Sequence, residues 1–182
     1  MKNELTLNDM TILGLLQEEE SGFTGKELEK IVEDRNMRNW TKIGKSTIYS
    51  NLKKLEKKKY VNFQESFKKN DPNFPPIREK YYSLTTQGKS HLESALYTTL
   101  STHKKIIDPF DISLAYLFYL TPEKRKKAID ERLEQILQRK IFLEKQCELS
   151  QDPIVFLLFS KPLYQVKAEE EWITTYYDQL TK

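Results

Sequence analysis

The chain has 182 residues, of which 38% are hydrophobic and 31% are charged, so it can bury a core as one large domain or as two small ones. Only 5 residues are glycine, which favours helices over a loop-rich all-β fold. No apolar run reaches the length of a membrane span, and a single cysteine excludes an internal disulfide framework. The N-terminus also lacks the apolar region of a signal peptide, so a cytoplasmic protein is predicted.

Positive charge is concentrated in one stretch of the chain. Residues 42–89 contain 12 lysine and arginine residues and 4 acidic residues, a net charge of about +8, whereas the whole chain carries +3. Residues 1–105 contain 19 basic and 14 acidic residues, and residues 106–182 contain 11 and 13. This asymmetry predicts a basic domain over residues 1–105 that binds double-stranded DNA, and a second domain with a different task over residues 106–182.

Apolar spacing predicts three helices in the first half of the chain. The first covers Leu7–Leu16, and the second starts at Thr24, which forms a capping-box pattern with Glu27. The third begins near Lys45. Its buried side is predicted to carry three apolar residues at helical spacing, namely Ile48, Leu52 and Leu55.

A hairpin and a fourth helix are predicted next. Two strand-like segments, Tyr60–Phe67 and Arg78–Leu84, flank the turn residues of Asn70–Pro76. A helix is then expected from Thr85 to about Thr102. Three helices followed by a hairpin are typical of a winged helix-turn-helix domain, so the predicted fold class is mainly α with a small β-hairpin (α+β).

The outer side of the third helix carries small hydroxyl groups at its start and lysines towards its end. Hydroxyl side chains let a helix approach base edges, and lysines reach phosphates. The residues predicted to bind DNA on and beside this helix are Lys42, Lys45, Ser46, Thr47, Tyr49, Ser50, Lys53 and Lys54. Those predicted on the hairpin are Lys68, Lys69, Arg78 and Lys80. The alternative is an ordinary solvated surface helix.

The second half is predicted to be helical throughout. A short apolar helix is expected over Asp111–Leu120, followed by a long helix that starts at Thr121-Pro122 and ends near Leu149. A last helix is expected after Pro153. Together they predict a helical, coiled-coil-like domain.

Both long helices repeat apolar residues at coiled-coil-like spacing, interrupted by Lys140 in one helix and by Glu170 in the other. This pattern predicts an antiparallel helix pair with apolar surface left for a second subunit. The alternative is an ordinary intramolecular bundle. The residues assigned to dimerisation are Leu133, Ile136, Leu143, Leu163, Val166, Ile173 and Leu180.

Catalytic and metal motifs are weak. Gly44–Ser46 imitates the end of a phosphate-binding loop, but Asn39 stands where that motif requires a glycine. His91, His103 and the distant Cys147 do not form a metal-ligand or nucleophile pattern. The sequence therefore predicts neither an enzyme nor a cofactor.

Four segments resemble the PadR family of transcriptional regulators, namely Ile12–Leu16, Ser21–Leu28, Thr47–Glu56 and Tyr81–Gly88. The resemblance covers about residues 5–100, and the helical second half looks like the C-terminal dimerisation domain of the longer PadR subgroup. It implies a homodimeric winged-helix repressor whose third helices enter successive major grooves of a pseudo-palindromic operator. In some members it also implies release by a small aromatic effector. The alternative function is a winged-helix protein-interaction scaffold that does not repress genes.

Two features of this chain differ from the family pattern or allow two interpretations. The family usually turns on a glycine after the third helix, whereas this chain has Lys58-Lys59, so we expect the last turn to continue or Asn62 to assist the turn. Trp40 is predicted to plug the core between the second and third helices, or alternatively to line an effector pocket. A cavity for the effector between the two halves would use Tyr81, Tyr82, Tyr97, Tyr116, Phe118 and Tyr119.

Overall fold

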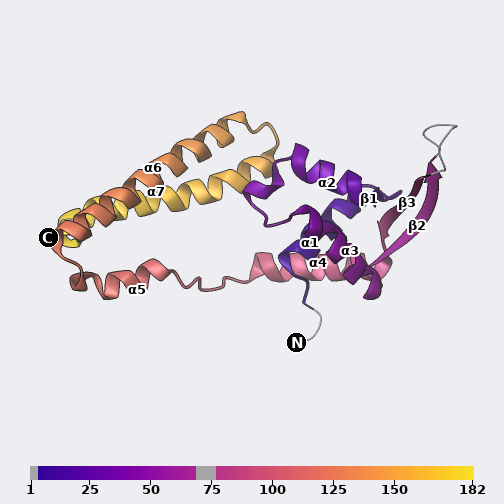
Figure 1. The fold of residues 1–182 in the computed structure, drawn as a ribbon, viewed down its shortest axis with the longest axis horizontal. Helices are drawn as coiled ribbons and strands as arrows, with labels where there is room; N and C mark the ends of the chain where they lie inside the picture. The colour runs from indigo at the N-terminus through magenta and orange to yellow at the C-terminus, as the bar shows by residue number, and fades with distance from the viewer. Residues whose placement is uncertain (1–3, 69–76) are drawn as a thin grey trace. The chain divides into compact units, whose positions relative to one another are not determined.

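The computed structural model describes residues 4–68 and 77–182 (Figure 1). The chain divides into two compact units, Met1–Lys104 and Lys105–Lys182. Lys69 and residues 70–76, which the sequence places in the turn of the hairpin, lie outside the described residues. No helix in the described residues is both long and apolar enough to cross a membrane.

The N-terminal unit contains the four predicted helices. They are α1 (Leu7–Gln17), α2 (Gly25–Asp34), α3 (Lys45–Lys57) and α4 (Thr86–Ser101), with a short 3-10 helix η1 (Met37–Asn39) between α2 and α3. The capping box predicted at Thr24 is confirmed, because its hydroxyl accepts from the backbone of Glu27 and the Glu27 carboxylate accepts from the backbone of Thr24. Thr6 and Asp9 form a second capping box at the start of α1.

A three-stranded antiparallel sheet completes this unit. The strands are β1 (Phe23–Thr24), β2 (Val61–Lys68) and β3 (Ile77–Leu84), in the order β1-β3-β2. The β2–β3 hairpin runs in register from Val61 opposite Leu84 to Lys68 opposite Ile77, and Figure 1 shows it projecting from the helices of its unit. Together with α1–α3, the hairpin gives the winged helix-turn-helix arrangement that the sequence predicts.

The corner between α2 and α3 differs from the prediction. Trp40 is 45% exposed, so the prediction that it plugs the core was wrong. Met37 of η1 is 6% exposed and packs in the core cluster with Ile48, Leu52 and Leu55 of α3. The short 3-10 turn directs Met37 inward, and Trp40 follows it on the outside.

The turn after α3 closes without a glycine. The backbone of Tyr60 donates to the carbonyl of Leu55, and that of Lys59 donates to the carbonyl of Glu56, which is the Schellman pattern. Lys59 has a φ of 61°, in the left-handed region. Neither predicted alternative is right, because the helix ends at Lys57 and a lysine takes the conformation that usually belongs to glycine.

Replacing Lys59 with glycine is expected to stabilise the N-terminal unit by about 1 kcal/mol, because glycine does not pay the steric cost of a left-handed backbone. Lys58→Gly is the matched control, since Lys58 has a right-handed helical backbone and its replacement should be destabilising. Thermal unfolding should show a higher melting temperature for the first variant and a lower one for the second. Equal shifts would contradict the explanation.

The C-terminal unit contains α5 (Pro109–Ala115), a 3-10 helix η2 (Leu117–Tyr119), α6 (Pro122–Leu149) and α7 (Pro153–Thr181). The predicted short helix over Asp111–Leu120 is therefore wrong in extent, because the chain leaves the α-helix at Ala115 and tightens into η2. The start signals for the two long helices are confirmed, since Thr121 caps α6 and Asp152 caps α7. Figure 1 shows α6 and α7 side by side along their length.

The two predicted interruptions of the apolar pattern pair with each other. Lys140 of α6 donates to the carboxylate of Glu170 of α7 at 2.7 Å, and both side chains are less than one third exposed. Lys167 and Glu144 form a further ion pair between the helices at 2.9 Å. An ion pair within an apolar seam penalises slipped alignments, so the Lys140–Glu170 pair favours one register of α6 against α7, whereas the exposed Lys167–Glu144 pair contributes little.

Candidate nucleic-acid interface

The orientation of α3 is set by its apolar side. Ile48, Leu52 and Leu55 are at most 1% exposed, which confirms the predicted buried stripe. Three buried aliphatic side chains on one side of a helix leave the opposite side to solvent. The outer face of α3 consists of the exposed residues Ser46, Tyr49, Ser50 and Lys53.

The hydroxyl groups lie along the first two turns of this outer face. The Ser50 hydroxyl donates to the carbonyl of Thr47 at 3.1 Å, so its oxygen remains available as an acceptor. Ser46 is exposed, and Thr47 is half-buried. Small side chains at these positions allow close approach of the helix to another surface, as the sequence suggests.

Tyr49 is held in place by a glycine of another helix. A Cβ atom added at Gly25, the first residue of α2, would lie 2.5 Å from a ring carbon of Tyr49. The Tyr49 ring therefore packs against the start of α2, while 40% of the residue stays exposed. Sequence reasoning did not single out Gly25, because the contact joins two residues on different helices.

Gly25→Ala is expected to weaken binding to a cognate DNA site about tenfold, because the new methyl group displaces Tyr49 from the outer face. The ring is the mobile end of a side chain, so the cost in stability should stay small. A double-mutant cycle with Tyr49→Ala tests this cause, and Gly25→Ala should have no further effect on affinity in that background. An undiminished effect there would show that Gly25 acts in another way.

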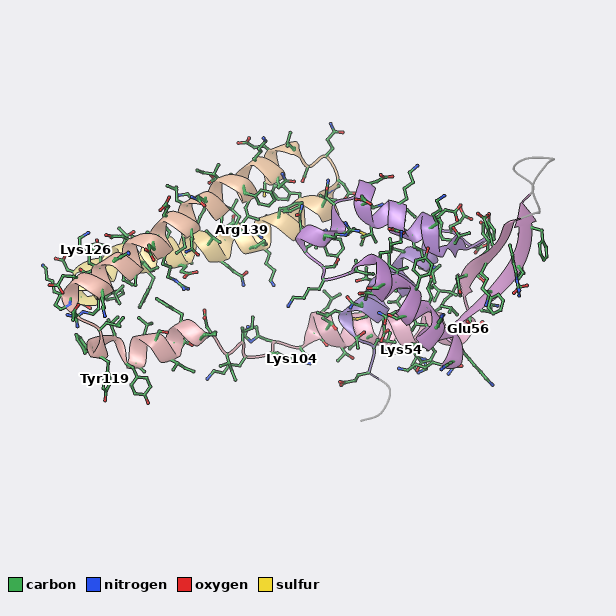
Figure 2. The ribbon with its side chains drawn as sticks, in the orientation of Figure 1. Lys54, Glu56, Lys104, Tyr119, Lys126 and Arg139 are labelled. Atoms are coloured by element: carbon green, nitrogen blue, oxygen red, sulfur yellow. The ribbon has the colours of Figure 1, made fainter. Side chains whose placement is uncertain are left out.

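The cations beside the outer face differ in how they are engaged. Lys45 pairs with Glu29 of α2 at 3.2 Å, but its side chain is 69% exposed, so the pair is weak and opens readily. Lys42 and Lys53 are exposed and form no ion pair within the described residues. Lys54, which is labelled in Figure 2, is engaged differently. Its ammonium group donates to the fully buried Asp9 of α1 at 2.7 Å.

The hairpin carries two further predicted cations. Arg78 of β3 forms an ion pair with Glu65 of β2, which lowers the pKa of Glu65. The Lys80 ammonium lies 3.6 Å from the centre of the Phe63 ring, in a cation–π contact. Both contacts cross between the paired strands of the hairpin. Lys68 is the last residue of β2.

The residues predicted for dimerisation contribute mainly to the core of the C-terminal unit. Leu143 and Ile173 have no exposed surface. Ile136 and Leu180 are also buried, and Leu133, Leu163 and Val166 are half-buried. The four buried residues therefore stabilise the C-terminal unit itself, and the assignment of all seven to dimerisation stays a prediction.

Comparison with known proteins finds a family model and solved structures that resemble this chain. Residues 12–94 match the model of the transcriptional regulator PadR-like family, whereas no curated protein matches the chain. PadR of Bacillus subtilis in complex with operator DNA is 20% identical, with a TM-score of 0.71 over 96% of this chain and 99% of that one. The same protein in complex with p-coumaric acid is 20% identical, with a TM-score of 0.72 over 97% of this chain and 100% of that one. A PadR-like transcriptional regulator from Bacillus cereus is 16% identical, with a TM-score of 0.60 over 95% of this chain and 97% of that one.

At 16–20% identity the solved structures show that this chain shares their fold. The evidence for a family relationship comes from the family model. The model covers the winged-helix unit, and the shared fold continues through α6 and α7. Residues 12–94, which make up most of the winged-helix unit, therefore belong to the transcriptional regulator PadR-like family, and the solved structures show that the rest of the chain shares their fold.

Proposed function

We propose that this chain is a sequence-specific repressor that acts in the cytoplasm as a homodimer on a pseudo-palindromic operator. The observation that carries the proposal is the outer face of α3, where exposed hydroxyl groups and Lys53 lie on a helix whose apolar side is fully buried. Such a helix fits the major groove, and the two recognition helices of a dimer reach successive grooves.

Within this proposal the residues divide by task. Ser46, Thr47, Tyr49 and Ser50 face the bases, because they lie in the first two turns of α3. The residues that hold phosphates are Lys42, Lys45, Lys53, Lys68, Lys69, Arg78 and Lys80. The ion pairs of Lys45 and Arg78 do not oppose this role, because both cations are more than 60% exposed and such pairs contribute little to stability.

The proposed dimer is supported by apolar surface that the C-terminal unit leaves uncovered. The side chains concerned lie on both long helices and are at least 46% exposed; they are Leu137, Ile141, Leu149, Ile154, Leu157 and Tyr164. Exposed apolar surface of this kind typically marks a protein interface. Sedimentation equilibrium of the full chain should give a dimer, and a monomer at micromolar concentration would contradict this part of the proposal.

We also propose that a small aromatic acid releases the repressor from DNA. PadR of Bacillus subtilis has been solved with p-coumaric acid, and this chain has an open pocket in its C-terminal unit. The pocket has a volume of about 270 Å³ and is lined by Phe110, Leu114, Leu117, Ile129 and the two arginines Arg125 and Arg132. An apolar lining with arginines suits an aromatic carboxylate.

The aromatic cavity predicted between the two halves draws on residues of both units and stays a prediction. Within its own unit, Tyr82 is buried in the core. Its burial, and to a lesser extent the negative charges of Glu56 and Tyr49, raise the pKa of its hydroxyl group. A melting-temperature screen with phenolic acids tests the effector. A stabilising shift is expected for p-coumaric acid, and uniform null shifts would leave constitutive repression.

A mobility-shift assay with the DNA upstream of its own gene tests the function itself. The expected result is a shift at low salt that a scrambled duplex of equal length does not compete away. The absence of any shift at low salt would contradict the proposal and favour the interaction scaffold.

A further inference from the structure

Asp9 is a buried carboxylate in the apolar helix α1. It has no exposed surface, although a buried charge costs free energy unless it is paired and hydrogen-bonded. Its Oδ2 atom accepts from the Thr6 backbone at 3.0 Å and from the Lys54 ammonium at 2.7 Å. Its Oδ1 atom is buried with no hydrogen-bond partner in the described residues. Lys54 therefore supplies the only cation paired with this carboxylate among the residues that the structure describes.

Lys53 and Lys54 are neighbours in α3 with different surroundings. Lys53 lies exposed on the outer face of α3. Lys54 is 39% exposed, and its ammonium group reaches the start of α1, which lies 45 residues earlier in the chain. Two identical side chains on one helix thus form a natural comparison between a free cation and an anchored one.

The anchored cation is poorly placed to serve a phosphate. Moving the Lys54 ammonium to DNA would leave the Asp9 carboxylate buried and without a counter-charge, which is the costly way to break an ion pair. The pairs of Lys45 and Arg78 carry a smaller penalty, since the glutamate left behind keeps 19% or 28% of its side-chain surface exposed to water, whereas Asp9 keeps none. Exchanging the carboxylate partner for a phosphate therefore costs more free energy at Lys54 than at Lys45 or Arg78.

We propose that Lys54 is a positioning residue that fixes the recognition helix α3 against the start of α1, and that it does not neutralise a phosphate. Asp9 then has two tasks, because the carboxylate that closes the capping box of α1 also holds α3 in place. This inference rests on the proposed DNA-binding function and removes one residue from its predicted contacts.

The salt dependence of DNA affinity distinguishes the two roles. Each neutralised phosphate contributes about 0.9 to the slope of log K against log salt, so Lys53→Gln should flatten the slope by about 0.9 per subunit. Lys54→Gln should weaken binding by a similar factor at every salt concentration and leave the slope unchanged. The probe is a fluorescein-labelled duplex from upstream of its own gene, titrated with the full chain. Equal flattening by both substitutions would overturn the inference.

A second variant keeps the test decisive where Lys54→Gln fails to fold. The double variant Asp9→Asn with Lys54→Gln replaces the ion pair by a neutral amide pair and leaves no buried charge behind. It should keep the wild-type slope, and a slope flattened by about 0.9 per subunit would overturn the inference. Wild-type protein that does not bind the duplex would instead refute the proposed function. In that case a larger loss of melting temperature in Lys54→Gln than in Lys53→Gln still supports the anchor, and equal losses contradict it.

Discussion

Replacing Gly88 with alanine is expected to destabilise the N-terminal unit by about 3 kcal/mol. A Cβ atom at Gly88 would lie 2.0 Å from the backbone carbonyl oxygen of Tyr60, and that carbonyl cannot move freely. It accepts from the backbone of Thr85 at 3.1 Å, and the Thr85 hydroxyl donates to the carbonyl of Lys59 at 2.8 Å. The start of α4 is thus docked directly on the turn that ends the recognition helix.

Gly14→Ala provides the matched control. Gly14 lies inside α1, and nothing lies within 4 Å of the position that its Cβ would take. Alanine is the better helix former by up to about 1 kcal/mol, so this variant should be more stable than the wild type. Urea denaturation followed by circular dichroism measures both changes. A gain in stability for Gly88→Ala would show that the close approach of backbone to backbone is not the reason for glycine there.

Asp9→Asn is expected to cost about 2 kcal/mol at neutral pH, because it leaves the Lys54 ammonium without its counter-charge. The figure is below that for a fully buried pair, since Lys54 is 39% exposed. Burial alone would raise the pKa of Asp9, but the hydrogen bonds from Lys54 and Thr6 outweigh it and hold the pKa below its ordinary value. A carboxyl group with a lowered pKa stabilises the folded state only while it is ionised.

The lowered pKa of Asp9 determines how the unfolding free energy depends on pH. The contribution of Asp9 is fully present above its unfolded pKa of about 3.9 and disappears as the pH falls through the lower folded value. The difference in unfolding free energy between wild type and Asp9→Asn should therefore be constant near neutral pH and shrink below about pH 4. Urea denaturation at a series of pH values measures it. A difference that stays constant into the acid range would contradict the ion pair.

Features set by local spacing were predictable from the sequence. The buried stripe of α3 follows from apolar residues four and three apart, and Thr24 with Glu27 signals the start of α2 within four residues. The same holds for the proline that begins each long helix of the C-terminal unit. In each case the residues that determine the structure lie within one or two turns of one another.

Features set by contacts between distant residues were not predictable in the same way. Spacing shows that Lys140 and Glu170 interrupt their helices, but only the fold brings them to 2.7 Å. Strand β1 has two residues, too few for an alternating pattern, and exists because it pairs with Tyr81 and Tyr82 of β3. A helical wheel leaves Lys54 among the outer lysines, since it cannot show that a buried carboxylate 45 residues away reaches it.

The left-handed backbone of Lys59 has the same kind of cause. Lysine does not favour this conformation, so no local rule predicts it. The residue is held between the end of α3 and the buried Tyr60, and its carbonyl accepts from the hydroxyl of Thr85. Tertiary structure thus imposes a turn that the sequence does not encode locally.

We propose that the outer face of α3 and the β2–β3 hairpin hold DNA mainly through its phosphates. The salt dependence of binding tests this proposal, measured by fluorescence anisotropy of the full chain with a duplex from upstream of its own gene. With Lys54 anchored to Asp9, the seven residues proposed to hold phosphates predict a slope of log K against log salt of about −6 per subunit. A slope near zero would contradict the proposal, because binding would then not involve this basic surface.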